Sequence, residues 1–292
     1  MIYSVRGTRG MAVAPHALAA QSALGVLREG GNALEAMIAA AASIAVAYPH
    51  MNSLGGDSFW LLYVPGMAPG AIDACGAAAA AASIGWYRDR GIEKSIPFRG
   101  GVAANTVAGT LSGWDVAFKL SRRWGGRLPL KRLLADAIHY AAEGVAVTGS
   151  QSTATAAKRA ELEAQPGFMA TFLPGGGVPA DGSLFKQPRL AATLDRLARA
   201  GLGDFYRGRL AKSIARDLAA AGSPLVLHDL QRHRARLVEP LALKHSLGTI
   251  YNLPPPTQGI VSLLILGMLD ALDVGSTGSA SADFVHLAVE AT

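Results

Sequence analysis

A short glycine-rich segment carries the first group of residues that could take part in chemistry. It contains Asn52, Gly55, Gly56 and Asp57. Paired glycines allow close approach of another backbone or a ligand, and their N–H groups could be taken for the donors of an oxyanion hole. The Asp57 carboxylate could contact a substrate, or it could close the loop by accepting hydrogen bonds from backbone N–H groups.

Cys75 is the single cysteine and a possible nucleophile. No histidine partner is evident for it, and a lone cysteine is also typical of a small packed residue. One cysteine excludes an intrachain disulfide framework and cysteine-rich zinc sites. The histidines His16, His50 and His286 are far apart and lack metal-ligand spacing, so capping or core hydrogen bonds are expected of them. The sequence therefore predicts no metal site.

Two helices and a strand hairpin must position the glycine segment. Residues 16–29 place apolar side chains at helical spacing, and Asn32 with Glu35 forms a capping-box pattern before a second, alanine-rich helix. Pro49 ends that helix. After the glycine segment, residues 59–64 and 71–74 read as two strands of one hairpin.

The rest of the chain alternates helical and strand patterns without an internal repeat. Residues 236–243 and 247–252 read as strands, and the helix expected over 260–272 is apolar nearly all round, so we expect it to be buried. Residues 174–179 lack the Lys-Ser/Thr of a phosphate-binding loop and predict a surface loop. Other helices are predicted over residues 82–90, 110–124, 130–143, 153–164, 187–200 and 208–221.

Composition bounds the possible functions. The chain has 292 residues, 50% of them hydrophobic and 16% charged, so it can bury a sizeable core as one large domain or two. The net charge is +6, but the basic residues are dispersed, and the cluster at 232–236 is either an anion patch or a solvated face. No apolar run reaches the ~18 residues that a membrane span needs. We therefore expect neither a nucleic-acid nor a membrane partner.

A series of short motifs runs in a fixed order along almost the whole chain. They are residues 29–32 (Glu-Gly-Gly-Asn), 49–50 (Pro-His), the glycine segment, 104–109, 113–114 (Gly-Trp), 187–194, 205–208, 227–230 and 254–259. This series resembles the γ-glutamyltransferase family of N-terminal-nucleophile hydrolases. Residues 104–105 are Ala-Asn where that family usually has Pro-Gly.

The resemblance implies an α/β (α+β) fold, a four-layer α/β/β/α sandwich of which this chain is the large-subunit portion. The hairpin and N-terminal helices would occupy about residues 1–80, a mainly helical region about 81–222, and strands with a buried helix about 223–292. It also implies that Gly55 and Gly56 form a structural loop near the site and not the oxyanion hole.

The resemblance further implies an amide hydrolase or acyltransferase that cuts its own precursor. The exposed threonine would begin a smaller C-terminal subunit and would form an acyl-threonine intermediate with a small-molecule amide, without a cofactor. No Thr-Thr-His segment occurs in this chain, and the helical pattern that begins near Ser281 stops at Thr292. We therefore expect no catalytic residue here and the C-terminal subunit as partner.

The family's substrate-binding arginine has no counterpart in this sequence. That arginine clamps the α-carboxylate of a glutamyl substrate, and Cys75, Gly76 and Ala77 stand at its place. Cys75 or Ala77 occupies the arginine position, depending on the alignment. Losing a desolvated clamp of this kind costs about 2 to 5 kcal/mol. We therefore expect another amide as substrate, unless an arginine within residues 88–99 reaches the site.

Two other interpretations stay open at this stage. The chain could belong to a family member that no longer cuts itself and serves as a binding or structural protein. A nucleotide-binding α/β domain is disfavoured, because the glycine pair leads into a strand and not into a helix. No charged leader followed by an apolar run is visible, so we expect a cytoplasmic protein or the mature form of a secreted one.

Overall fold

The computed structural model describes residues 6–278 and 281–292. Residues 1–5, where a leader sequence would begin, lie outside the described part. The chain forms two compact units. Unit 1 comprises Met1–Asp57 and Gly76–Arg234, and unit 2 comprises Ser58–Cys75 and Ala235–Thr292. The hairpin therefore groups with the C-terminal residues, whereas the sequence suggested consecutive segments along the chain.

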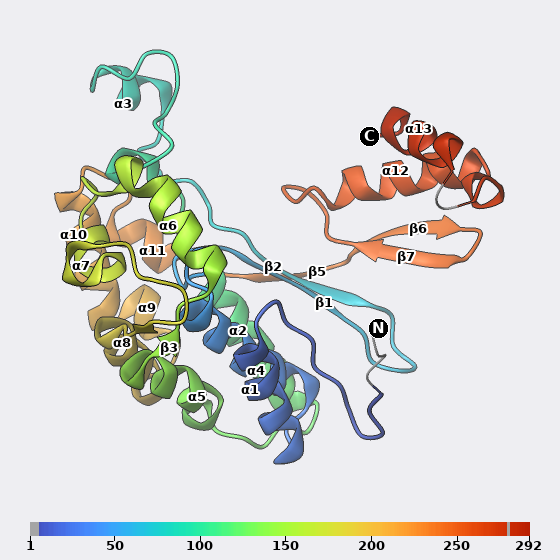
Figure 1. Cartoon of the computed structure of the whole chain (residues 1–292), viewed down its shortest axis with the longest axis horizontal. Coiled ribbons are helices and arrows are strands. Elements are labelled where there is room, and N and C mark those ends of the chain that lie inside the picture. The colour runs from blue at the N-terminus through green and yellow to red at the C-terminus, as the bar shows by residue number, and fades with distance from the viewer. Residues whose placement is uncertain (1–5, 279–280) are drawn as a thin grey trace. The chain divides into compact units, whose positions relative to one another are not determined.

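Unit 1 is built around the apolar helix α2 (Ala33–Ala47), which packs against α1 (Ala17–Arg28), α4 (Thr110–Arg123) and α5 (Leu130–Glu143) (Figure 1). The chain from α2 to α5 supplies much of the core, including the fully buried Trp114. Further helices of this unit are α3 (Ile84–Arg88), α6 (Gly149–Leu162), α7 (Phe168–Phe172), α8 (Pro188–Ala200), α9 (Asp204–Arg207), α10 (Arg209–Ala220) and α11 (Leu227–Arg232), with 3-10 turns η1 (Gly101–Ala103) and η2 (Pro174–Gly176).

Local capping fixes where several helices begin. The Nδ1 atom of His16 accepts a hydrogen bond from the Leu18 N–H at 3.2 Å, and it thereby caps α1. The predicted capping box of α2 is confirmed, with Asn32 and Glu35 each accepting from the other's backbone N–H at 3.1 Å. Thr148 caps α6, which starts at Gly149, earlier than the sequence pattern indicated, because the cap precedes the alanine-rich run.

Unit 2 contains the predicted hairpin, which is confirmed. Strands β1 (Ser58–Leu62) and β2 (Gly70–Ala74) pair antiparallel, and β5 (Arg236–Val238) pairs antiparallel with the other edge of β2. The register places Asp73 opposite Phe59 on one side and Arg236 on the other. In unit 1, β3 (Val145–Ala146) and β4 (Leu184–Phe185) form a separate short ladder.

The predicted strand over residues 236–243 is wrong, because the structure divides it into two strands that join different sheets. β5 ends at Val238, and β6 (Leu241–His245) pairs with β7 (Gly248–Asn252). Pro240 stands between β5 and β6. Proline has no N–H to donate to a ladder, so it allows the chain to leave one sheet and enter another.

The expectation that the helix over 260–272 is buried is also wrong for this chain. Helix α12 (Gly259–Ala271) packs against β6 and β7, and Leu263 is buried, but the Leu264 side chain is 60% exposed (Figure 1). A helix that is apolar on all sides is hydrophobic, but its sequence does not show which of its faces pack against other elements of the chain. Unit 2 then ends with the 3-10 turn η3 (Val274–Ser276) and helix α13 (Ala282–Glu290). Among the described residues, no helix is both long and apolar enough to cross a membrane.

Candidate functional site

The glycine segment is held by the N-terminus of α4. The Thr110 side-chain hydroxyl donates to the carbonyl oxygens of Gly56, at 2.7 Å, and Asp57, at 3.0 Å. The Thr110 N–H also donates to the Gly56 carbonyl oxygen at 2.8 Å. On the other side of the loop, the Asn52 N–H donates to the Tyr48 carbonyl oxygen at 3.1 Å and the Gly55 N–H donates to the Ser53 hydroxyl at 3.1 Å. The loop is therefore fixed by hydrogen bonds at both of its ends.

Asp57 connects this loop to the segment that contains Gly76 and Ala77. Its Oδ1 atom accepts a hydrogen bond from the Gly76 N–H at 2.8 Å. The loop-closing interpretation of this carboxylate requires a bond of this kind to a backbone N–H. The structure thus brings together Gly55, Gly56, Asp57, Gly76 and Ala77 within unit 1.

Hydrogen bonds hold the segment after Gly76 at Ala77, Ala79 and Ala80. The Val107 N–H donates to the Ala77 carbonyl oxygen at 2.9 Å, and the Ala79 N–H donates to the Asn105 carbonyl oxygen at 2.8 Å. The Oδ1 atom of the buried Asp229 accepts from the Ala80 N–H at 3.1 Å. Residues 76–80 therefore form a fixed strip against residues 105–107.

Tyr206 holds the residues that follow residues 105–107, at the start of α4. Its buried hydroxyl donates to the Ala108 carbonyl oxygen at 2.7 Å and accepts from the Ser112 N–H at 2.9 Å. Burial raises the pKa of the Tyr206 hydroxyl well above its ordinary value, so this group stays protonated and able to donate. No short-range sequence pattern indicates this role of Tyr206, because its two partners lie far away in the chain.

We expect Tyr206→Phe to lower the free energy of unfolding by about 1 to 3 kcal/mol, because the Ala108 carbonyl oxygen and the Ser112 N–H both lose a partner. The measurement is the denaturant midpoint of the full-length protein. Tyr63→Phe is the matched control, since the Tyr63 side chain is 70% exposed. Equal midpoints for the two variants would contradict this role of Tyr206.

Cys75 belongs to unit 2, at the end of β2, where it is half-buried. Its backbone N–H donates to the Oδ1 atom of Asp73 at 2.9 Å. The Oδ2 atom of Asp73 pairs with the Nη2 atom of Arg236 at 3.0 Å. Sequence reasoning missed Arg236, because only the pairing of β5 with β2 brings it to this position.

Two of the arginines within residues 88–99, Arg90 and Arg99, are engaged elsewhere in unit 1. Arg90 donates to the Trp86 carbonyl oxygen and stacks on the Trp86 ring, and Arg99 pairs with Glu161. Among the described residues, no group of three or more His, Cys, Asp or Glu side chains could hold a metal ion.

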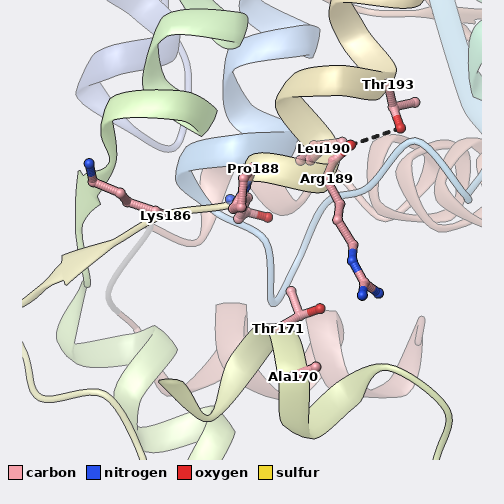
Figure 2. A pocket seen from close by; sticks show the side chains of 8 residues that line it. Ala170, Thr171, Lys186, Pro188, Arg189, Leu190 and Thr193 are labelled. Atoms are coloured by element: carbon pink, nitrogen blue, oxygen red, sulfur yellow. Dashed lines mark hydrogen bonds between the residues drawn. The ribbon is translucent and has the colours of Figure 1, made fainter. Parts of the chain in front are cut away.

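A separate pocket of unit 1, about 390 Å³ in volume, lies at the start of α8. Figure 2 shows Arg189 extending toward Thr171 of α7, while Lys186 lies on the other side of the pocket. The Thr193 hydroxyl donates to the Arg189 carbonyl oxygen at 3.0 Å. None of the residues predicted for the site lines this pocket, so it does not belong to the candidate site.

Comparison with known proteins identifies the family. The γ-glutamyltranspeptidase family model matches residues 19–292. This chain belongs to the γ-glutamyltranspeptidase family. Members of this family are hydrolases and transferases that act on amides, so the sequence prediction of an enzyme family is confirmed.

Two curated relatives in the γ-glutamyltranspeptidase family are named as proenzymes. The oxamate amidohydrolase proenzyme of Klebsiella pneumoniae is 57% identical, over 98% of this chain and 53% of its own length. The glutathione hydrolase-like YwrD proenzyme of Bacillus subtilis is 36% identical, over 99% of this chain and 54% of its own. The chain therefore spans about half the length of these relatives.

A solved γ-glutamyltranspeptidase has the same fold. The Helicobacter pylori enzyme superposes with a TM-score of 0.90 at 26% identity, over 99% of this chain and 82% of that one. This similarity confirms the predicted α/β class and the N-terminal-nucleophile hydrolase fold.

Proposed function

We propose that this chain is the large-subunit portion of a self-processing amide hydrolase whose substrate is a small carboxylate-bearing amide, with oxamate as the first candidate. One observation argues against a γ-glutamyl substrate: residues 73–82 contain no arginine at the position where the family's glutamyl clamp is expected. A neutral side chain cannot reproduce bidentate recognition of an α-carboxylate. The observation that carries the proposed substrate class is the 57% identity to an oxamate amidohydrolase proenzyme.

The chemistry would use a threonine on the C-terminal subunit. Its hydroxyl oxygen would attack the amide carbonyl carbon while the threonine amine takes the hydroxyl proton. The amine would then pass that proton to the leaving nitrogen as the C–N bond breaks, so that ammonia is released and the threonyl ester remains. Water would then hydrolyse the threonyl ester, returning the hydroxyl and yielding oxalate when oxamate is the substrate. A pair of backbone N–H groups on that subunit would stabilise the oxyanion.

This chain would hold the loops around the site in place and would contact the substrate. The bonds from Thr110 and Gly76 hold the glycine segment in place, and the strip of residues 76–80 is held by residues 105–107 and Asp229. Such a fixed frame is what a site needs in order to hold reacting groups in a productive geometry.

Expression of the full reading frame tests this proposal. We expect two fragments on a denaturing gel, and kcat/KM for ammonia release from oxamate at least about 100-fold above that for hydrolysis of γ-glutamyl-p-nitroanilide, because the glutamyl clamp is missing. Cys75→Arg and Ala77→Arg would show whether either position can restore glutamyl hydrolysis.

Other outcomes would contradict the proposal. A single uncut chain that hydrolyses neither substrate would favour the non-catalytic binding or structural protein. A cut enzyme that prefers the γ-glutamyl anilide would contradict the substrate class while keeping the amide hydrolase.

A further inference from the structure

The sheet of unit 2 places a guanidinium beside the end of β2. Asp73 and Arg236 are register partners in the antiparallel pair of β2 and β5, so their side chains lie on the same face of the sheet. The Nη2 atom of Arg236 lies 3.0 Å from the Oδ2 atom of Asp73. The other carboxylate oxygen of Asp73 accepts from the Cys75 N–H at 2.9 Å. A single carboxylate therefore connects Arg236 to the backbone at Cys75.

The two members of this pair differ in exposure. The Asp73 side chain is 10% exposed and is fixed by the backbone bond, whereas the Arg236 side chain is 73% exposed. A guanidinium has five N–H donors in a planar fork, and within the described part of the chain Asp73 engages it through Nη2. The remaining donors are available to a second carboxylate, for which the fork geometry is suited.

We propose that Arg236 binds the carboxylate of the small amide substrate. This inference rests on the function proposed above, in which the substrate carries a carboxylate next to the scissile carbonyl. The arginine that binds the substrate carboxylate would therefore stand on the neighbouring strand β5, whereas the family's arginine is expected just after the end of β2. Asp73 is then a positioning residue, because it holds the guanidinium through one nitrogen and leaves the rest of the fork to the substrate.

A purely structural ion pair is the competing explanation. Asp73 and Arg236 would then only hold β5 against β2, and an ion pair whose arginine is 73% exposed contributes little to stability. Removing Arg236 would in that case affect charged and neutral substrates alike. The two explanations therefore differ in whether the effect depends on the substrate's carboxylate.

The experiment compares oxamate with oxamide, its neutral diamide, in the processed full-length enzyme. For Arg236→Gln we expect KM for oxamate to rise about 10- to 100-fold, as for a lost hydrogen-bonded charge pair, with the kinetics for oxamide changed less than about twofold. Arg236→Lys should recover part of the loss, because it keeps the charge without the fork. Arg232→Gln, which removes an exposed arginine of the same basic cluster, is the control and should leave both substrates unchanged.

The outcomes separate this inference from the proposed function. If the wild-type enzyme hydrolyses oxamate and Arg236→Gln changes both substrates equally or neither, the role of Arg236 is overturned and the proposed function stands. If the wild-type enzyme is cut but releases no ammonia from oxamate, the proposed substrate is wrong and the role of Arg236 is overturned with it.

Discussion

Replacing Gly76 by alanine is expected to disrupt the fold around the candidate site. A Cβ atom at this position would lie 1.6 Å from the Val107 carbonyl oxygen and 2.7 Å from its carbonyl carbon. Both are backbone atoms, so no side-chain rotation can relieve the overlap. Overpacking costs about 1 to 3 kcal/mol when neighbours can move, and we expect at least about 3 kcal/mol here because residues 105–107 are themselves bonded to residues 77–79.

The denaturant midpoint and the soluble yield of the full-length protein measure this effect. Gly70→Ala is the matched control, because a Cβ atom at Gly70 meets nothing within 4 Å. We expect that control to stay within about 0.5 kcal/mol of the wild type. A Gly76→Ala protein as stable as Gly70→Ala would show that residues 76–80 are not held against residues 105–107.

Replacing Glu35 by alanine is the second substitution for which we expect a large loss of stability. The Glu35 side chain is fully buried, and its Oε1 and Oε2 atoms accept from the N–H groups of Leu128, at 3.0 Å, and Asn32, at 3.1 Å. Arg122 lies 3.9 Å away and balances the charge. Removing the carboxylate leaves both N–H groups without these acceptors, so we expect a loss of about 3 kcal/mol.

Two further variants show whether the loss of stability comes from the lost hydrogen bonds of Glu35 or from the removal of a negative charge. Glu35→Gln keeps one carbonyl oxygen as acceptor and should lose less stability than Glu35→Ala. Glu143→Ala, at the exposed end of α5, should change the unfolding midpoint by less than about 0.5 kcal/mol. If Glu35→Ala unfolds at the same denaturant concentration as Glu143→Ala, the network does not stabilise the fold.

Elements encoded by short-range patterns were predicted well from the sequence. The hairpin of β1 and β2 follows from two apolar runs around a turn, and helix α5 begins at Leu130 and ends at Glu143 as its pattern indicated. The single strand over residues 236–243 and the burial of α12 were predicted wrongly. Both depend on which other element lies alongside, and a hydropathy pattern carries no information on that.

Contacts between distant residues could not be predicted in the same way. Glu35 accepts from the N–H of Leu128, 93 residues away, and the Tyr206 hydroxyl donates to the carbonyl oxygen of Ala108, 98 residues away. Asp73 and Arg236 are 163 residues apart. No local spacing rule links such positions, because they meet only after the helices and strands have packed.

The sequence by itself determined the family, the capping box at Asn32 and Glu35, the hairpin, and the absence of an arginine from residues 73–82. These follow from ordered motifs and from interactions within a few residues. The tertiary structure decided that Asp57 bonds the Gly76 N–H and that Arg236 lies beside Asp73. Those outcomes depend on strand register and helix packing, in which hydrogen-bonding groups far apart in the chain find one another when the core closes.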